Sequence, residues 1–398
     1  MMCKTLYICY FGLQEPLVQT QVLPYLREIG KAGIEVNLLT FEPNFRKKWG
    51  VKRIDIEKKK LAVEGINWYC LPYHKRPSAI VTSYDVLRGA ALVLKIVRRK
   101  KINVLHARTH IPLMMALLIK PLTNCKLIFD IRGLIAEEYA DAGIWRENSK
   151  IYRFIKNIEH KGIKQASQIV VLTNRFRDYL VENKLKDRES IEVIPCCVDF
   201  SRIEQGFDKS EKSNRFELIY AGSATGLYLL REMGLFFLEL KKYKPDAFFR
   251  VLTTSPKEFV QEVFRQLKIS ENDYAVAKVS PEKVPLYLKK AHLGISFRKA
   301  TFAQIAASPT KIPEYLACGL PVVSNYGIGD TDWLLENEEV GIYLKNFDQK
   351  EIEKAVKEII KLEESEIAEK CAKVAVKYFD LETVGGKRYE NVYRRLSE

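Results

Sequence analysis

Residues 308–324 have the sequence Ser-Pro-Thr-Lys-Ile-Pro-Glu-Tyr-Leu-Ala-Cys-Gly-Leu-Pro-Val-Val-Ser. The hydroxyl residues and the proline at 308–310 are typical of a helix start, because a side-chain oxygen can cap the free amides and proline fits the first turn. Gly319 is a natural stop for this helix, and the apolar run at 320–324 predicts a buried strand. A helix that leads into a buried strand is the repeating unit of a parallel sheet. Taken alone, the segment could be an ordinary, well-capped crossover helix.

The same alternation of strands and helices extends over most of the chain. Continuous apolar runs bounded by breakers predict buried strands at 5–9, 34–39, 102–106, 126–130, 168–172, 191–195, 216–220, 248–253, 293–297, 322–324 and 341–344. Helical periodicity occupies 19–32, 84–101, 150–166 and the stretch from the 216–220 strand to about residue 240. Alternating strands and helices predict an α/β fold with doubly wound parallel sheets.

The chain length and one polar stretch predict two domains. A chain of 398 residues is too long for one ordinary core, and residues 199–215 have the composition of a linker. We expect one Rossmann-like domain at 1–199 and a second at 200–380, with the helical segment 381–398 packing back on the first. Because parallel sheets bind ligands beyond the carboxyl ends of their strands, we expect the two domains to face each other across a cleft lined by loops of both.

Composition narrows the class of protein. The eight cysteines contain no C-x-x-C pair and the five histidines have no metal-ligand spacing, which predicts a reduced cytoplasmic protein without a structural metal. The longest apolar run, at 111–119, is too short to span a bilayer, and the first residues are typical of a strand rather than a signal peptide. The net charge of +15 is uneven: residues 1–200 hold 34 Lys and Arg against 20 Asp and Glu, whereas residues 201–398 hold 31 against 30. The first half should therefore meet an anionic partner or present a basic surface. No nucleic-acid-binding module is recognisable, so we expect no nucleic acid partner.

Lys311 distinguishes the 308–324 helix from an ordinary crossover helix. It places a positive charge in the first turn, where the helix dipole already concentrates positive charge, so the position is unfavourable unless an anion is bound there. Free amides, two hydroxyls and an ammonium group together suit a diphosphate. Glu314 follows, where its carboxylate could accept hydrogen bonds from ribose hydroxyls.

Four segments resemble the retaining family 4 glycosyltransferases, which have the GT-B fold. They are residues 308–324, 168–198, 218–222 and 276–297, of which the first is the most specific, and together the resemblance covers nearly the whole chain. It implies that residues 1–199 are the acceptor-side domain and residues 200–380 the nucleotide-sugar domain. It also implies a donor pocket lined by Gly222, Ser223, Ser308, Thr310, Lys311 and Glu314, with backbone near Val279 binding the base.

This chain departs from the family pattern at two charged positions. Ala306 stands where the family commonly has a first glutamate, and Ser223 stands where an arginine usually follows the glycine loop. We expect Lys311, together with Arg298 or Lys299 after the preceding strand, to replace the missing phosphate-binding cation. A protein that kept the fold and lost the chemistry is the less favoured alternative.

The first domain offers polar clusters at two predicted strand ends. One contains His106, Arg108 and His110, and the other contains Asp130 and Arg132, followed by Glu137 and Glu138. A single histidine here would more often be structural, but two charged clusters at adjacent strand ends indicate a site. We expect Arg132, His106 and Lys311 to be catalytic. On the acceptor side we expect Arg108 and Glu138, with Gly12 and Gln14 from the loop after the first strand. That loop lacks G-x-G-x-x-G, which argues against a dehydrogenase.

A basic surface is predicted in the first domain. Residues 44–60 contain eight Lys or Arg residues together with Phe45 and Trp49, and residues 84–101 form an amphipathic pattern that ends in four cations. Basic residues mixed with aromatic ones suit an anionic membrane face, although a solvated basic face explains 84–101 equally well.

The predicted function follows from the resemblance. We expect a hexosyltransferase of polysaccharide biosynthesis that uses a nucleotide-diphosphate sugar, with UDP slightly favoured and no metal. It would act on a glycan or lipid-linked acceptor with retention, at the inner face of the membrane. The alternatives are a sugar-nucleotide epimerase of GT-B fold and a non-catalytic protein that binds anionic surfaces.

Overall fold

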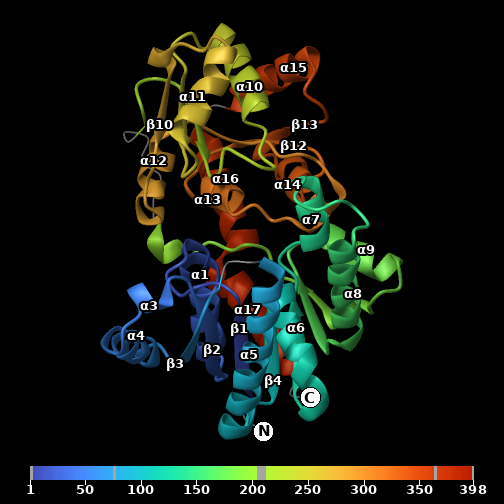
Figure 1. Ribbon diagram of the computed structural model, residues 1–398. Helices are drawn as coiled ribbons and strands as arrows, with labels where there is room; N and C mark the ends of the chain where they lie inside the picture. The colour runs from blue at the N-terminus through green and yellow to red at the C-terminus, as the bar shows by residue number, and fades with distance from the viewer. Residues whose placement is uncertain (1–2, 75–77, 204–211, 363–364, 397–398) are drawn as a thin grey trace. The chain divides into compact units, whose positions relative to one another are not determined.

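Two parallel β-sheets, one in each half of the chain, organise the computed structural model (Figure 1). The structure describes residues 3–74, 78–203, 212–362 and 365–396. The chain divides into unit 1, which is Met1–Pro195 with Leu381–Glu398, and unit 2, which is Cys196–Asp380. Of the polar stretch predicted as a linker, residues 204–211 lie outside the described ranges. The two sheets with their helices confirm the predicted α/β class and its doubly wound architecture.

The sheet of unit 1 has seven strands in the order β3-β2-β1-β4-β5-β6-β7. All its strand pairs are parallel. The strands are β1 (Lys4–Cys9), β2 (Glu35–Glu42), β3 (Ile66–Pro72), β4 (Val104–Arg108), β5 (Lys126–Asp130), β6 (Gln168–Val171) and β7 (Ile191–Val193). The strand order reverses between β1 and β4, so a ligand site is expected where these two strands end. The sequence analysis predicts no strand at β3, which lies at the edge of the sheet and mixes buried with half-buried residues.

The helices of unit 1 connect these strands. They are α1 (Pro16–Gln21), α2 (Leu23–Lys31), α3 (Phe45–Lys48), α4 (Val51–Val63), α5 (Ser78–Lys100), α6 (His110–Ile119), α7 (Ile135–Asp141), α8 (Lys150–Gln165), α9 (Asn174–Glu182) and α17 (Lys387–Arg395). The single helix predicted at 19–32 is in fact two, α1 and α2, because Pro24 has no N–H to continue the helical hydrogen bonding. Over the described ranges, none of the helices is long and apolar enough to cross a membrane.

The sheet of unit 2 has six strands in the order β10-β9-β8-β11-β12-β13, again all parallel. The strands are β8 (Glu217–Ala221), β9 (Phe248–Leu252), β10 (Tyr274–Ala277), β11 (Leu293–Ser296), β12 (Val322–Asn325) and β13 (Gly341–Leu344). Its helices are α10 (Leu230–Tyr243), α11 (Lys257–Gln266), α12 (Val284–Lys290), α13 (Lys311–Ala317), α14 (Thr331–Glu338), α15 (Gln349–Ile359) and α16 (Ser365–Phe379). The strand order reverses between β8 and β11, so the carboxyl ends of these two strands mark the expected ligand site.

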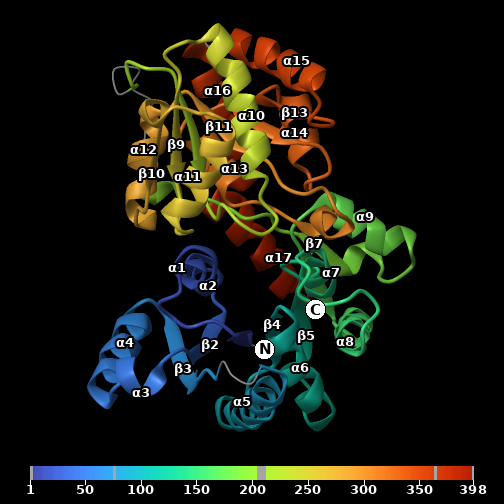
Figure 2. The same cartoon turned by 45° about the horizontal axis from the view of Figure 1, so that its top comes forward.

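Helices cover both faces of the second sheet. Figure 2 shows α10 and α11 on one side of the strands, where they share an apolar cluster with α15. Residues of α12, α13, α14 and α16 build a second apolar cluster with the sheet. Gly294 in β11 makes the close approach of α13 possible, because a Cβ there would lie 2.4 Å from the ring of Tyr315. The Tyr315 hydroxyl accepts a hydrogen bond of 2.8 Å from the amide of Ala221, which ties α13 to the end of β8.

Candidate active site

The helix quoted from the sequence is α13, and it begins at Lys311. Thr310 occupies the N-cap without a side-chain capping bond, so the predicted hydroxyl cap is wrong. Ser308 Oγ instead accepts a hydrogen bond of 3.1 Å from the amide of Cys196, within the same unit. The helix ends at Ala317 with Cys318 as its C-cap, and Gly319 follows with φ of 71°, as its predicted role as a stop requires.

Lys311 is buried at the start of α13, with 5% of the residue exposed. Its ammonium nitrogen lies 3.9 Å from the ring centre of Tyr228 and 4.8 Å from that of Tyr220. Among the described residues it forms no ion pair with a carboxylate. Burial lowers the pKa of Lys311 to about 8, while Tyr228 acts to raise it and Arg298 to lower it further. The protein therefore holds a desolvated cation stabilised mainly by aromatic faces.

Gly222 brings the end of β8 against this ammonium group. Its φ is 144°, in the region that favours glycine, and a Cβ at this position would lie 3.0 Å from Lys311 Nζ. Ser223 follows and is exposed, with its hydroxyl 3.3 Å from that of Thr225 and 3.4 Å from that of Ser255. The structure therefore brings Gly222 and Lys311 together, as predicted, and adds a cluster of exposed hydroxyls beside them.

Arg298 supplies a second cation at the same edge, one residue beyond Phe297 at the end of β11. Its guanidinium carbon lies 5.2 Å from the centre of the Tyr228 ring, the same ring that Lys311 faces. The side chain of Asn325 fixes the Arg298 backbone, accepting from its amide at 2.8 Å and donating to its carbonyl at 3.0 Å. Arg298 Nε is buried and has no hydrogen-bond partner among the described residues.

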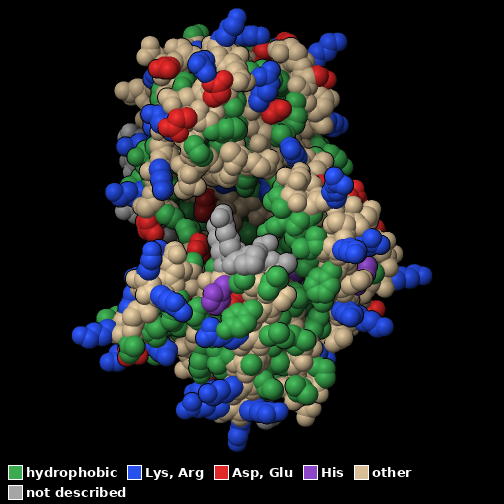
Figure 3. Space-filling view, viewed as in Figure 1, with side chains coloured by type: hydrophobic (Ala, Val, Ile, Leu, Met, Phe, Trp, Pro, Cys, Tyr) green, Lys and Arg blue, Asp and Glu red, His purple; other side chains and the backbone are tan. Residues whose placement is uncertain are grey.

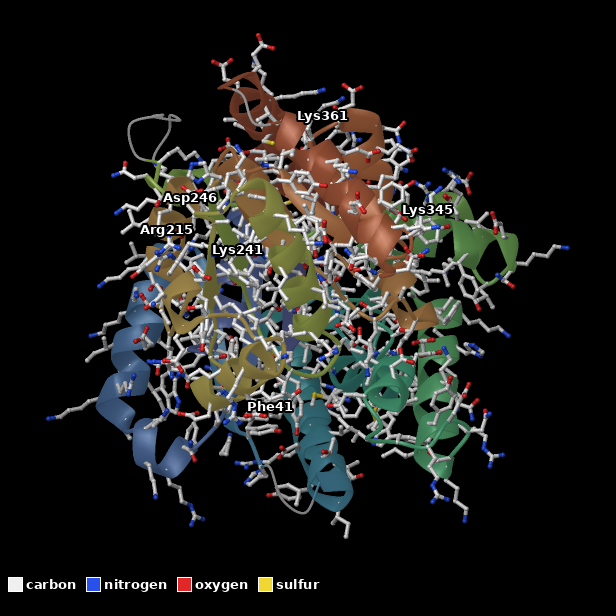
Figure 4. All side chains as sticks on the ribbon, turned by 90° about the horizontal axis from the view of Figure 1, so that it is seen from above. Phe41, Arg215, Lys241, Asp246, Lys345 and Lys361 are labelled. Carbon is white, nitrogen blue, oxygen red and sulfur yellow. The ribbon has the colours of Figure 1, made fainter. Side chains whose placement is uncertain are left out.

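Several other cations of unit 2 have acidic partners. Lys241 and Arg215, labelled in Figure 4, both pair with Asp273, at 2.7 and 3.4 Å. Arg250 pairs with Glu217 at 2.5 Å. Lys311 and Arg298 form no such pair among the described residues and share one aromatic ring at the point where β8 and β11 end. Two cations without acidic partners at this edge are suited to an anion such as a diphosphate.

The other predicted donor residues surround this pair less closely. Glu314 is half-buried on α13, one turn after Lys311. Its negative charge acts to raise the pKa of Lys311. Val279 follows β10 and packs on the apolar cluster that also contains Ile312. Thr310 is half-buried beside Lys311. The sequence analysis did not single out Tyr220 and Tyr228, although aromatic residues around a glycine loop are a usable signal.

The predicted first-domain residues form a buried polar network in unit 1. His106 on β4 is fully buried, with Nδ1 2.7 Å from the Tyr393 hydroxyl and Nε2 3.4 Å from Asp130 Oδ2. Arg132 Nε lies 2.7 Å from Asp130 Oδ1, and Arg132 also donates to the hydroxyl of Tyr389. Because Tyr389 and Tyr393 belong to α17, this network fastens the C-terminal helix to the sheet. The position of His106 favours a structural role over the catalytic one predicted for it.

The charges in this network do not balance. Burial would raise the pKa of Asp130, but Arg132, His106 and Arg108 outweigh it and hold that pKa well below its usual range. Burial lowers the pKa of His106, so the imidazole is the neutral partner. Arg108 Nη1 lies 3.7 Å from Asp130 Oδ2, which makes two arginines for one carboxylate. Arg108 and Arg132 are therefore gathered as predicted, but as buried groups.

The predicted acceptor-side residues come from the loop after β1, the end of β4 and helix α7. Gly12 is buried against Pro43, whose Cδ would lie 2.6 Å from a Cβ at position 12. Gln14 is exposed in the loop after β1. Glu138 lies on α7 with its carboxylate against Gly133, where a Cβ would lie 2.4 Å from Oε1. The part of the chain that the structure describes contains no cluster of His, Cys, Asp and Glu that could hold a metal ion.

The basic surface predicted at 44–60 is formed by α3 and α4. Figure 3 shows Lys and Arg side chains gathered over these helices and at the end of α5. All eight cations of the segment are exposed, and so are the apolar residues Val51, Ile56 and Val63. Trp49, predicted as part of this surface, is instead buried, with its ring 5.3 Å from that of Trp68.

Comparison with known proteins agrees with this architecture. Residues 18–202, most of unit 1, match the model described as Glycosyltransferase Family 4. A glycosyltransferase from Rickettsia africae has a similar structure, with a TM-score of 0.69 and 16% identity over 100% of this chain and 99% of that one. Sucrose-phosphate synthase from Thermosynechococcus elongatus has a TM-score of 0.71 and 12% identity, covering 99% of both chains.

Two more solved structures resemble this chain. Anabaena HepE in complex with UDP and glucose has a TM-score of 0.65 and 14% identity, over 98% of this chain and 99% of that one. A putative UDP-N-acetylglucosamine 2-epimerase from Listeria monocytogenes has a TM-score of 0.61 and 13% identity, over 100% and 97%. These likenesses confirm the GT-B fold. Comparison with curated protein sequences gives no match.

Proposed function

We propose that this protein is a member of glycosyltransferase family 4 and transfers a hexose from a nucleotide-diphosphate sugar to a hydroxyl group of a glycan or a lipid-linked saccharide. The observation that carries the proposal is the pair Lys311 and Arg298, which face one tyrosine ring and no acidic partner among the described residues. Burying an ammonium group without an ion pair is unfavourable, and a bound diphosphate would reduce that cost. Anabaena HepE, which shares the fold, binds UDP and glucose, and this supports UDP as the favoured nucleotide.

In this proposal unit 2 stabilises the leaving group. Lys311 and Arg298 neutralise the charge that grows on the diphosphate as the bond to the sugar breaks. The side-chain cations can supply this neutralisation without a metal. Gly222 lets backbone approach the phosphates, Ser223 donates its hydroxyl, and Glu314 accepts from the ribose. The base would lie near the backbone of Val279.

Retention of configuration and the acceptor class remain parts of the proposal. Retention is what the resemblance to family 4 implies. Unit 1 would bind the acceptor, and the buried arginines Arg108 and Arg132 would give its sheet edge a positive potential. The exposed cations and apolar residues of α4 suit the cytoplasmic face of an anionic membrane, where a lipid-linked acceptor would be presented.

A thermal-shift panel of UDP, GDP, ADP and their sugars tests the donor assignment. We expect one diphosphate to raise the melting temperature of the wild type, with a smaller rise for Glu314→Ala and none for Lys311→Ala. Unchanged shifts in both variants would place the donor elsewhere. Incubation with donor alone separates this function from that of an epimerase, because an epimerase changes the sugar without an acceptor. Proton NMR of the product's anomeric signal then tests retention.

A further inference from the structure

The backbone of unit 2 places Tyr228 directly opposite Arg298. Tyr228 lies just before α10, and it forms an isolated antiparallel bridge with Arg298, which follows β11. The amides of Leu229 and Lys299 donate to carbonyls of the opposite segment at 3.1 and 2.9 Å. These two hydrogen bonds flank the bridge, and in a pair of this type the two opposite side chains approach each other most closely. The bridge therefore brings the Tyr228 ring beside the Arg298 guanidinium, whose carbon lies 5.2 Å from the ring centre.

Lys311 reaches the same ring from the start of α13. Its ammonium nitrogen lies 3.9 Å from the centre of the Tyr228 ring and 4.8 Å from that of the Tyr220 ring. The centres of these two rings are 6.0 Å apart, and their planes meet at 64°. The Tyr220 hydroxyl donates to the carbonyl of Ser223, which fixes its ring against the glycine loop. The loop after β8, the end of β11 and the start of α13 therefore meet at Tyr228.

Phe248 provides a comparison within the same unit. Its ring, at the start of β9, also faces two cations: the guanidinium carbon of Arg215, labelled in Figure 4, lies 4.7 Å from the ring centre, and that of Arg250 lies 5.3 Å from it. Both arginines also pair with a carboxylate, Arg215 with Asp273 at 3.4 Å and Arg250 with Glu217 at 2.5 Å. These ion pairs neutralise both cations, at the edge of the sheet opposite to the one where parallel sheets bind ligands.

The ring of Tyr228 holds its two cations without neutralising them. In the part of unit 2 that the structure describes, neither Arg298 nor Lys311 forms an ion pair with a carboxylate. A carboxylate would cancel the charge of a cation and compete with an incoming anion. An aromatic ring attracts the cation through its quadrupole and carries no net charge. Both positive charges therefore remain available to a ligand, and cations that are already in place need little rearrangement when it binds.

We propose that Tyr228 is a positioning residue of the donor site, whose ring holds the Arg298 guanidinium and the Lys311 ammonium in the arrangement that binds a diphosphate. The diphosphate replaces the weak ring contacts with charge-assisted hydrogen bonds. Tyr228 acts through the two cations and need not touch the substrate itself. This role rests on the proposed binding of a nucleoside diphosphate, and it adds the group that orders the cations before the ligand arrives.

Calorimetric titration with UDP tests this role on the full-length wild type, Tyr228→Leu, Tyr228→Phe and the control Phe248→Leu. We expect Tyr228→Leu to weaken UDP binding by about 10-fold or more, the size of two cation–ring contacts. Tyr228→Phe should recover most of this loss, because the ring remains. Phe248→Leu should keep the wild-type affinity, because carboxylates hold the two arginines that face this ring.

Two further measurements separate positioning from packing. In the Lys311→Met background, Tyr228→Leu should cost only about threefold in UDP affinity, since only the contact with Arg298 is left to lose. Tyr228→Glu places a carboxylate beside both cations. It should weaken UDP binding more than Tyr228→Leu does, while its urea midpoint stays at or above that of the wild type. Damage to packing would instead lower both the affinity and the urea midpoint.

Several results would overturn the positioning role and leave the donor site standing. They are a UDP affinity of Tyr228→Leu within about threefold of the wild type, equal losses in Tyr228→Leu and Tyr228→Phe, or a loss that is the same with and without Lys311. In each case the wild type would still bind UDP. A wild type that binds none of UDP, GDP and ADP would overturn the donor site, and the role of Tyr228 with it.

Discussion

Replacing Lys311 by methionine is expected to stabilise unit 2 and to weaken its binding of a nucleoside diphosphate. Burial lowers the pKa of Lys311 from 10.5 to about 8. A lowering of this size corresponds to roughly 3 kcal/mol, at about 1.4 kcal/mol per pKa unit. Methionine fills a similar volume without a charge, so the variant should gain up to that amount of unfolding free energy at pH 7. Binding should weaken by about 10- to 150-fold, the value of a hydrogen bond to a charged group.

The sign of the pH dependence makes this prediction specific. The unfolded lysine binds its proton more tightly than the folded one, so the wild type gains stability as pH rises from about 8 to 10.5. The advantage of Lys311→Met should therefore be complete below pH 8 and should disappear towards pH 10.5. Urea denaturation at pH 7 and pH 10, with and without UDP, measures both effects.

Lys212→Met is the matched control. Burial lowers the pKa of Lys212 to about 8 as well, but this ammonium donates a hydrogen bond to the carbonyl of Ala291. The buried thiols of Cys318 and Cys371 and the carboxylate of Glu217 act to raise its pKa. Its substitution should leave UDP binding unchanged. The reasoning would be refuted if Lys311→Met were destabilised at pH 7 or kept wild-type affinity for UDP.

Three further outcomes are expected. Asp130→Asn should lower the unfolding free energy by about 3–5 kcal/mol, because it leaves two buried arginines without their carboxylate. Since the folded pKa of Asp130 is depressed, the stability that its carboxylate contributes should be present at neutral pH and lost in acid. An unchanged urea midpoint at pH 7 would contradict this prediction. Gly222→Ala should weaken UDP binding by roughly tenfold or more, since its backbone strain costs about 1–3 kcal/mol and its Cβ meets Lys311, and calorimetry measures this. Changing Lys58, Lys59 and Lys60 together to Gln should weaken binding to phosphatidylserine vesicles by about 100-fold, at about 1 kcal/mol per cation. Phosphatidylcholine vesicles are the control. Equal binding by the variant and the wild type would show that α4 does not contact the membrane.

The strands that could be predicted from the sequence are those buried on both faces. Such strands form continuous apolar runs, and β1, β4, β5, β8 and β11 all have this pattern. The two missed strands, β3 and β10, lie at sheet edges, where burial is incomplete and the apolar pattern weakens. The single helix predicted at 19–32 runs over two helices, because the pattern of apolar residues continues through the break that a proline imposes.

The candidate site was predictable only in part. The misplaced charge of Lys311 is visible in the sequence, because a cation in a first helical turn conflicts with the helix dipole. Its two aromatic partners come from a different part of the chain, and no local pattern connects them. His106 is the opposite case, because it was predicted to belong to the site and is instead buried. Nothing in the sequence around this strand-end histidine indicates that a tyrosine of the C-terminal helix will cover it.

Proton uptake on nucleotide binding tests the central claim most directly. At pH 8 about half of the Lys311 side chains are protonated in the free protein, since the pKa is about 8. A diphosphate bound to the ammonium would raise that pKa, so binding should take up about half a proton at pH 8 and close to one at pH 9. Calorimetric titration with UDP in two buffers of different ionisation enthalpy gives this number. Uptake that rises from pH 7 to pH 9 and is absent in Lys311→Met is the predicted result; UDP binding without proton uptake at pH 8 would contradict the account.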